Sequence, residues 1–206
     1  MLRLALFSLC FGTVSLSAQT LFNGRDLAGW TMTGPGSFIV EEGLLTTNGG
    51  MGLLYYNVRP FRNSTLKVVF RTASQRGNSG IFIRLPEKPK DPWYGVHNGY
   101  EVQIDSGGDI WHRTGAIYSL SKAEGDWQQN PQGEWNTLEI RLEDKVTTIS
   151  LNGKKVNTFA EGSPVPERKM WFEPIRGPRP GEGYIGVQNH DGASKVQFRE
   201  ITVKPN

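Results

Sequence analysis

Apolar and polar residues alternate along most of the chain after residue 20. In residues 66–71 the apolar residues Leu66, Val68 and Phe70 would face one way, and residues 137–142 repeat the pattern. A period of two is typical of strands that pack one face on a core. No segment shows a sustained helical period with caps, so the pattern predicts roughly ten or more antiparallel strands.

A turn signal supports this assignment. The pair Asn152-Gly153 separates two alternating runs, 146–151 and 155–159. A two-residue type I′ hairpin needs positive φ at both central positions, which this pair tolerates. The chain has 206 residues and no internal repeat or linker. We therefore predict an all-β fold, a two-sheet antiparallel jelly-roll sandwich, in a single domain over residues 20–206.

Two long stretches interrupt the alternation, Pro86–Asn98 and Ala160–Gly183. Irregular stretches of this length are uncommon in compact domains unless they have a function. They carry Trp93 and Trp171, and a further loop carries Trp127. Aromatic faces in loops suit stacking on sugar rings, although some of these side chains could instead close the ends of the sheets. We expect the two stretches to form the walls of a binding cleft.

The N-terminus has a different character. Arg3 precedes an apolar run, Leu4–Val14, and small residues follow it at Ser17 and Ala18. This predicts a signal peptide over residues 1–18, cleaved near residue 17 or 18, and a periplasmic or secreted protein. A retained membrane anchor is the alternative, but the run is shorter than the ~20 residues that a span needs. We thus expect no transmembrane segment in the mature chain.

Composition excludes several classes of protein. The only cysteine, Cys10, lies in the predicted signal peptide, so the mature chain has no disulfide and no thiolate zinc site. The net charge is only +3 and the basic residues are scattered, which argues against a nucleic-acid partner. Three histidines without close spacing predict no metal site. Calcium held by backbone carbonyls and Asp109 or Asp126 stays open.

The candidate site centres on residues 100–105. Here Tyr100, Val102 and Ile104 alternate with three polar residues; these are Glu101, Gln103 and Asp105. Same-face side chains on a strand stand about 6.6 Å apart, so the three would form a row on the open face. A solvated strand face is the alternative interpretation.

Two further runs present polar residues on the same kind of face. Arg84 would share a strand face with Phe82, where it could stabilise a developing oxyanion or pair with a carboxylate of the 100–105 run. Gln188 and His190 alternate in residues 184–190. Histidine exchanges protons near neutral pH, although a lone histidine is more often structural or simply exposed.

The chain resembles the 3-keto-disaccharide hydrolase domain family over nearly all of residues 20–206. The segments that carry the resemblance are LFNGRDLAGW (21–30), GNSGIFIR (77–84), GYEVQID (99–105), TGAIY (114–118), GEWNTLEI (133–140), LNGKKV (151–156), GYIGVQNH (183–190) and FREITVKP (198–205). The resemblance implies a concanavalin A-like jelly roll and export. Asn189 stands where relatives often carry Asp.

The resemblance also implies a chemistry. A ketone at C3 of a glycoside acidifies the C2 proton, a base removes it, and the C1 substituent leaves by elimination. Addition of water then completes a hydrolysis; without it the enzyme is a lyase. The site needs a general base and a stabiliser of the enolate oxygen.

Seven polar positions match the family's segments: Arg84, Glu101, Gln103, Asp105, Asn136, Gln188 and His190. We expect Glu101 or His190 to be the base and Arg84 to stabilise the enolate. The substrate-binding residues expected are Gln103, Asp105, Gln188, Asn136, Trp93 and Trp171.

Two other functions remain open. The row Glu-x-Gln-x-Asp is similar to the Glu-x-Asp-x-Glu strand of retaining jelly-roll glucanases, with Gln103 replacing the central acid. A laminin-G-like module that binds glycans without catalysis would use the same kinds of residue. In each case the partner is a carbohydrate.

Overall fold

The computed structural model describes residues 17–74 and 76–206. The predicted signal peptide, residues 1–18, falls almost entirely outside these ranges. Among the described residues, no helix is both long enough and apolar enough to cross a membrane.

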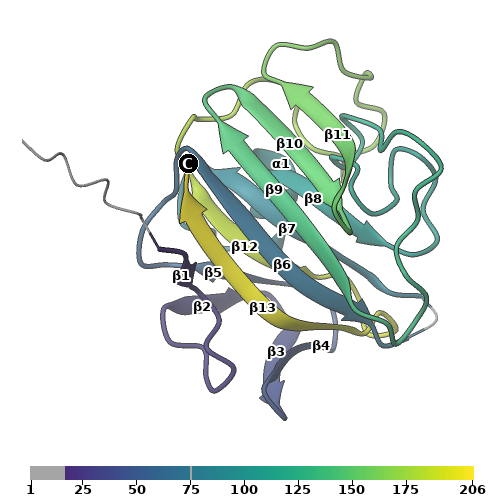
Figure 1. The fold of residues 1–206 in the computed structure, drawn as a ribbon. Coiled ribbons are helices and arrows are strands. Elements are labelled where there is room, and N and C mark those ends of the chain that lie inside the picture. The colour runs from purple at the N-terminus through teal and green to yellow at the C-terminus, as the bar shows by residue number, and fades with distance from the viewer. Residues whose placement is uncertain (1–16, 75) are drawn as a thin grey trace, which may run out of the picture.

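The described residues form two antiparallel sheets that pack face to face (Figure 1). The strands of the eight-stranded sheet are β1 (Gln19–Thr20), β3 (Ser37–Glu41), β4 (Leu44–Asn48), β6 (Ser64–Thr72), β9 (Asn136–Glu143), β10 (Val146–Leu151), β11 (Lys154–Ala160) and β13 (Val196–Pro205). The strands of the five-stranded sheet are β2 (Trp30–Thr33), β5 (Gly52–Tyr56), β7 (Asn78–Leu85), β8 (Tyr100–Asp105) and β12 (Tyr184–Asn189). The predicted two-sheet antiparallel sandwich is confirmed.

The larger sheet runs in the order β11-β10-β9-β6-β13-β4-β3, with β1 beside β13. The smaller sheet has the order β2-β5-β12-β7-β8. Figure 1 shows β9, β6 and β13 in front of β8, β7 and β12. Most of the predicted site residues lie on or next to β7, β8 and β12, and these three strands are therefore neighbours in one sheet.

The alternating apolar residues fill the space between the sheets. Leu66, Val68 and Phe70 of β6 belong to the same buried cluster as the apolar residues of β8, which are Tyr100, Val102 and Ile104. Each fully buried large apolar side chain contributes about 1.5–3 kcal/mol of transfer free energy. This packing fixes which face of β8 points away from the core.

The predicted hairpin is present. β10 pairs with β11 through a turn at Asn152-Gly153, where φ is +50° and +79°. Both central residues thus have the positive φ that a type I′ turn requires.

A short helix, α1 (Pro92–Asn98), interrupts the stretch predicted to be irregular at Pro86–Asn98. The Asp91 side chain caps it by accepting from the Tyr94 N–H at 3.0 Å, and Pro92 fits the first turn because its missing N–H is not needed there. The helix is too short to show a helical period in the sequence. It covers part of the outer face of the smaller sheet, where Val96 packs in a second apolar cluster with Leu53, Phe82 and Leu85.

The strand alternation of β7 changes at Arg84, which has φ +55°. Opposite this point Tyr184 pairs with Leu85 and Gly186 pairs with Phe82, so β7 contains one residue more than β12. Such a bulge reverses the facing of later side chains. Leu85 therefore joins Phe82 under α1, and Arg84 does not share the Phe82 face as the sequence suggested.

The second predicted irregular stretch, Ala160–Gly183, contains no helix or strand between the end of β11 and the start of β12. Arginine side chains hold it in place. The Arg179 guanidinium donates to four backbone carbonyls, those of His97, Gly99, Ile175 and Gly177. Because these bonds reach both α1 and the residue before β8, the stretch is fixed against the smaller sheet.

Asn189, at the end of β12, links the two sheets. Its buried Nδ2 donates to the carbonyls of Ser37 and Asn48, at 3.0 and 2.9 Å.

We expect Asn189→Asp to lower the free energy of unfolding by on the order of 2–3 kcal/mol, because a carboxylate would face two carbonyl oxygens without a proton to donate. Urea denaturation measures this. The same change at the exposed Asn48, whose Nδ2 contacts the Ser37 hydroxyl, is the control and should have little effect; equal losses would contradict the assignment.

Candidate functional site

A cavity of about 390 Å³ opens on the outer face of the smaller sheet. Its volume falls in the range of ligand sites. We call it the Glu101 pocket, and its lining residues are Met51, Asn78, Trp93, Val96, Glu101, Gln103, Asp105, His112, Tyr118, Phe172, Gln188 and His190. They come from β7, β8, β12, α1 and the loops around them. The structure thus brings together six of the predicted site residues: Trp93, Glu101, Gln103, Asp105, Gln188 and His190.

Glu101 and Gln103 point away from the core, as their alternation with Tyr100 and Val102 predicts. Their face is not open to solvent, however, because α1 and the loops cover it: Glu101 is 5% exposed and Gln103 is 3% exposed. Gly80 lies beside Glu101 on the neighbouring strand, where a Cβ would stand 2.3 Å from Glu101 Oε1. The absence of a side chain at position 80 makes room for the carboxyl group.

The Glu101 carboxyl group is in an unusual electrostatic environment. Burial raises its pKa to about 8, and its Oε1 has no hydrogen-bond partner in the protein. A carboxyl group whose pKa is near the working pH can both take up and release a proton. Its position and its pKa therefore suit general acid–base chemistry.

Two further acceptors in the pocket lack partners. Gln103 Oε1 and Gln188 Oε1 are buried without a hydrogen bond from the protein. The Gln103 amide is oriented by Asn78, whose Oδ1 accepts from Gln103 Nε2 at 3.0 Å. Buried polar atoms are normally paired, so these oxygens favour a ligand that donates several hydrogen bonds, such as a polyhydroxylated sugar.

Each histidine in the pocket has an aspartate on its Nδ1. His190 Nδ1 lies 2.7 Å from Asp191 Oδ2, and His112 Nδ1 lies 2.7 Å from Asp109 Oδ1. Such a carboxylate fixes the ring orientation and the tautomer. His112 Nε2 also contacts the Ser119 hydroxyl at 3.2 Å. Among the described residues His190 Nε2 has no such partner, so His190 is the histidine whose second nitrogen is available to a ligand.

Sequence reasoning missed His112 and Asp191 as members of the site. The signal for Asp191 was its position directly after His190. Although partial burial raises the pKa of Asp191, hydrogen bonds from His190 and from the Ser194 and Ala193 N–H groups lower it overall, so the carboxylate stays ionised. The signal for His112 was weaker, since Asp109 precedes it by three residues inside a loop.

Aromatic side chains form one wall. Trp93 of α1 lines the pocket, and its ring centroid lies 4.7 Å from that of Trp171. Trp171 is 63% exposed and packs against Trp93 without lining the pocket, while its neighbour Phe172 reaches the pocket lining. Trp171 therefore supports the wall and extends it at the surface.

Arg84 lies elsewhere. Its guanidinium donates to the carbonyls of Pro180 and Asp144, at 3.1 and 2.8 Å, and lines a different cavity that includes Glu161. The bulge at this position turns the side chain away from the face that carries Glu101. Arg84 therefore reaches neither the predicted enolate site nor the carboxylates of β8, and its observed contacts hold the 160–183 stretch.

Asn136 is also outside the pocket. It begins β9 in the other sheet, where its Oδ1 accepts from the Asn130 N–H at 2.7 Å and from Asn152 Nδ2 at 3.0 Å. These bonds fix a loop and the hairpin turn. Asn136 is a structural residue here.

The described residues contain no group of three or more His, Cys, Asp or Glu side chains placed to hold a metal ion. Asp109, one of the two aspartates considered for calcium, contacts His112 and accepts from the Trp111 N–H. No cofactor enters the chemistry considered below.

A family model described as a 3-keto-alpha-glucoside-1,2-lyase-like domain matches residues 17–204. A crystal structure of a protein from Parabacteroides distasonis ATCC 8503, provisionally named as a glycosyl hydrolase, is 27% identical, with a TM-score of 0.74 over 92% of this chain and 94% of that one. A second structure so named from the same organism is 24% identical, with a TM-score of 0.76 over 92% and 100%.

The carbohydrate-binding module CBM66 from Bacillus subtilis shares the fold at 14% identity, with a TM-score of 0.59 over 85% of this chain and 95% of that one. No curated protein sequence is significantly similar to this chain.

The raised pKa of Glu101 predicts a pH-dependent stability. The ordinary value is 4.5 and the folded value is about 8, so between these limits only the unfolded chain readily ionises at this position. Wild-type stability from this group is complete below 4.5 and is lost as the pH rises toward 8. We expect the stability of Glu101→Gln relative to wild type to increase by more than ~1 kcal/mol across this window. Urea titrations at both ends test it.

The matched control is Glu139→Gln, at an exposed position on β9. Its stability relative to wild type should not change with pH in the same way. A difference between Glu101→Gln and wild type that is constant with pH would show that the buried carboxyl ionises normally.

Proposed function

The chain belongs to the 3-keto-alpha-glucoside-1,2-lyase-like domain family, and we propose that it cleaves glycosides whose C3 hydroxyl group has been oxidised to a ketone. The family and the similar protein provisionally named as a glycosyl hydrolase support a carbohydrate-related function. The bond cleaved and the residue roles given below are our proposal.

The observation that carries the proposal is the buried carboxyl group of Glu101, which lines a cavity of sugar size and whose Oε1 has no hydrogen-bond partner in the protein. In its ionised form Glu101 removes the proton from C2 of the 3-keto sugar. The electron pair forms an enolate, with its charge on the C3 oxygen. When the C3 carbonyl forms again, a double bond forms between C1 and C2 and the C1–O bond breaks.

The leaving oxygen needs a proton, and His190 is the proposed donor. Asp191 holds its Nδ1–H, and in the imidazolium form Nε2 carries the proton that passes to the leaving oxygen. Water addition across the new double bond would give net hydrolysis, and release without it would make the protein a lyase. Both outcomes use the same first step.

The enolate oxygen requires hydrogen-bond donors, and Arg84 is too far removed to supply one. Gln188 and Tyr118 line the pocket instead. Burial, with a contribution from the nearby Glu101 carboxylate, raises the pKa of Tyr118 to about 12. The phenol therefore keeps its proton at neutral pH and can donate to an oxyanion. We assign Gln188 and Tyr118 to this role.

The remaining polar groups would hold the sugar. Gln103 offers its free Oε1 to a hydroxyl group, and Asp105 lies at the end of the same strand face. Trp93 provides an apolar surface for the ring. With Asp105 oriented by the Gly107 N–H at 2.8 Å, both acceptors are fixed before a ligand arrives.

A glycosidase with two catalytic carboxylates fits this pocket less well. Retaining enzymes place their carboxyl groups about 5–5.5 Å apart and inverting enzymes about 6.5–9.5 Å apart. Glu101 and Asp105 are four positions apart on one strand, which separates their backbones by about 13 Å. Proton abstraction needs only one of them.

The proposal includes export, since an apolar N-terminal run ending in small residues is typical of a signal peptide. A mature N-terminus near residue 18 or 19, found by mass spectrometry of periplasmic or secreted protein, would support it. An intact N-terminus would contradict it.

Substrate selectivity tests the reaction. The purified protein should release the aglycone from a 3-keto-glucoside and leave the unoxidised glucoside intact. Cleavage of the plain glucoside would support a two-carboxylate glycosidase, and binding of either without turnover would support a glycan-binding module.

Variants test the residue roles. We expect Glu101→Gln to lower kcat by at least about 10²-fold, because the amide cannot accept the C2 proton. His190→Ala should lower kcat less with an acidic leaving group, which departs without help. Glu139→Gln is the control and should be as active as wild type. Full activity in both Glu101→Gln and His190→Ala would contradict the assignment.

The pH profile gives an independent test. With an acidic leaving group, which needs no proton donor, only the ionised base limits the reaction, so kcat/KM should rise with pH until the pKa of Glu101, about 8, is passed. A profile that is already flat from about pH 5 upward, near an ordinary glutamate pKa, would exclude Glu101 as the base.

A further inference from the structure

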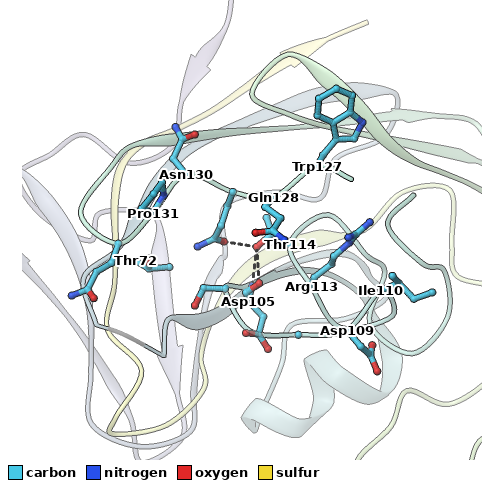
Figure 2. Close-up of a pocket in the computed structure, with 14 residues that line it drawn as sticks. Thr72, Asp105, Asp109, Ile110, Arg113, Thr114, Trp127, Gln128, Asn130 and Pro131 are labelled. Atoms are coloured by element: carbon cyan, nitrogen blue, oxygen red, sulfur yellow. Dashed lines mark hydrogen bonds between the residues drawn. The ribbon is translucent and has the colours of Figure 1, made fainter. Parts of the chain in front are cut away.

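A second cavity, of about 340 Å³, lies beyond the end of β8. We call it the Thr114 pocket. Its lining residues are Thr72, Asp105, Ser106, Gly108, Asp109, Ile110, Arg113, Thr114, Trp127, Gln128, Gln129, Asn130, Pro131 and Gln132. Figure 2 shows Thr114 near its centre, hydrogen-bonded to Asp105, which lies below it in this view, whereas Trp127 lies above it. The chemistry proposed above uses none of these residues except Asp105.

Three buried polar atoms on the residues of this pocket have no partner in the protein: Thr72 Oγ1, Arg113 Nε and Gln129 Nε2. Other polar atoms of Gln129 and Arg113 are engaged. Gln129 Oε1 accepts from the Thr114 hydroxyl at 2.5 Å, and Arg113 Nη2 donates to the Ala123 and Gly125 carbonyls. An unpaired buried polar atom costs free energy, so the three atoms favour a ligand that offers acceptors.

The same pocket also contains acceptors. Asp105 and Asp109 each contribute a carboxylate, whereas Arg113 is the one cationic residue of the lining. An excess of carboxylates disfavours an anionic ligand such as phosphate. A neutral ligand with several hydroxyl groups fits best, because each hydroxyl both donates and accepts.

An aromatic surface completes the lining. Trp127 is 42% exposed, and the Lys154 ammonium lies 3.5 Å from the centroid of its ring. An indole that is partly covered on one side and borders a polar cavity suits a pyranose ring, which has apolar C–H groups next to its hydroxyls.

We propose that the Thr114 pocket binds a second, uncharged sugar ring. This inference goes beyond the proposed function and rests on it only for the source of the ring. The ring is either a further unit of the substrate, attached to the sugar in the Glu101 pocket, or part of a separate saccharide. Asp105 lines both pockets, and Asp109 of this pocket contacts His112 of the other. The two sites are thus adjacent, which makes one extended substrate geometrically reasonable.

Two variants remove the pocket's contacts while preserving its structure. Gln129→Glu keeps an acceptor for Thr114 and removes the free Nε2 donor. Trp127→Ala removes the aromatic surface. The matched control is Gln197→Glu on β13, where Oε1 accepts from Arg71 Nε and the pocket is not involved.

Binding is measured by the indole N–H resonances of the six tryptophans, with glucose and α-1,4-, α-1,1- and β-1,4-linked glucose disaccharides as probes. We expect at least one disaccharide to shift the Trp127 resonance, which Trp127→Ala identifies by its loss. Gln129→Glu should weaken this binding about tenfold, the effect of one to two hydrogen bonds, and Gln197→Glu should not.

Turnover separates the two sources of the ring. If it belongs to the substrate, both pocket variants should raise KM for a 3-keto-disaccharide about tenfold and leave the kinetics of methyl 3-keto-glucoside unchanged. If the ring belongs to a separate saccharide, the variants should lose disaccharide binding, but the KM for a 3-keto-disaccharide should not rise relative to that for methyl 3-keto-glucoside.

The inference is overturned if no saccharide shifts the Trp127 resonance and neither variant changes the kinetics. A shift produced by calcium and by no sugar would also overturn it. Should the wild-type protein cleave no keto-glycoside, the proposed function fails, but the binding measurement still decides the role of the Thr114 pocket.

Discussion

The burial of one ionisable carboxyl group shapes the whole outer face of the smaller sheet. Glu101 fits on that face because Gly80, beside it, has no side chain, and it is buried because α1 and the 160–183 stretch cover it. The cover removes water and raises the pKa of the carboxyl group. A strand face that would otherwise be solvated thus becomes a reactive site. In return, burying the Glu101 carboxyl group lowers the stability of the folded protein at neutral and higher pH.

Hydrogen bonds from arginine side chains hold the 160–183 part of this cover. Arg179 and Arg84 donate to backbone carbonyls of the 160–183 stretch or of residues next to it. A guanidinium group can satisfy several carbonyls at once, which suits a long segment without secondary structure. The proline residues in this stretch lack N–H groups, so such side-chain donors replace the bonds that a strand would have made.

Alternation in the sequence was sufficient to predict the sandwich and the outward facing of Glu101, Gln103 and Gln188, and the Asn152-Gly153 pair predicted the hairpin. It works because a buried face tolerates few polar groups, so the pattern is imposed at every second residue. It failed at Arg84, where one extra residue in β7 reverses the facing; a bulge leaves no reliable mark in the sequence. It also missed α1, which is too short to be periodic, and the Asp109–His112 contact, which depends on how a loop folds.

The displacement of Arg84 has a consequence for the sugars that can enter. None of the residues that line the Glu101 pocket is a lysine or an arginine, so this cavity has no permanent positive charge. A uronic acid or a phosphorylated sugar would lose its hydration there without gaining a counter-ion. The pocket is consequently selective for uncharged sugars because it contains no lysine or arginine. The association of such sugars with the pocket should depend little on ionic strength.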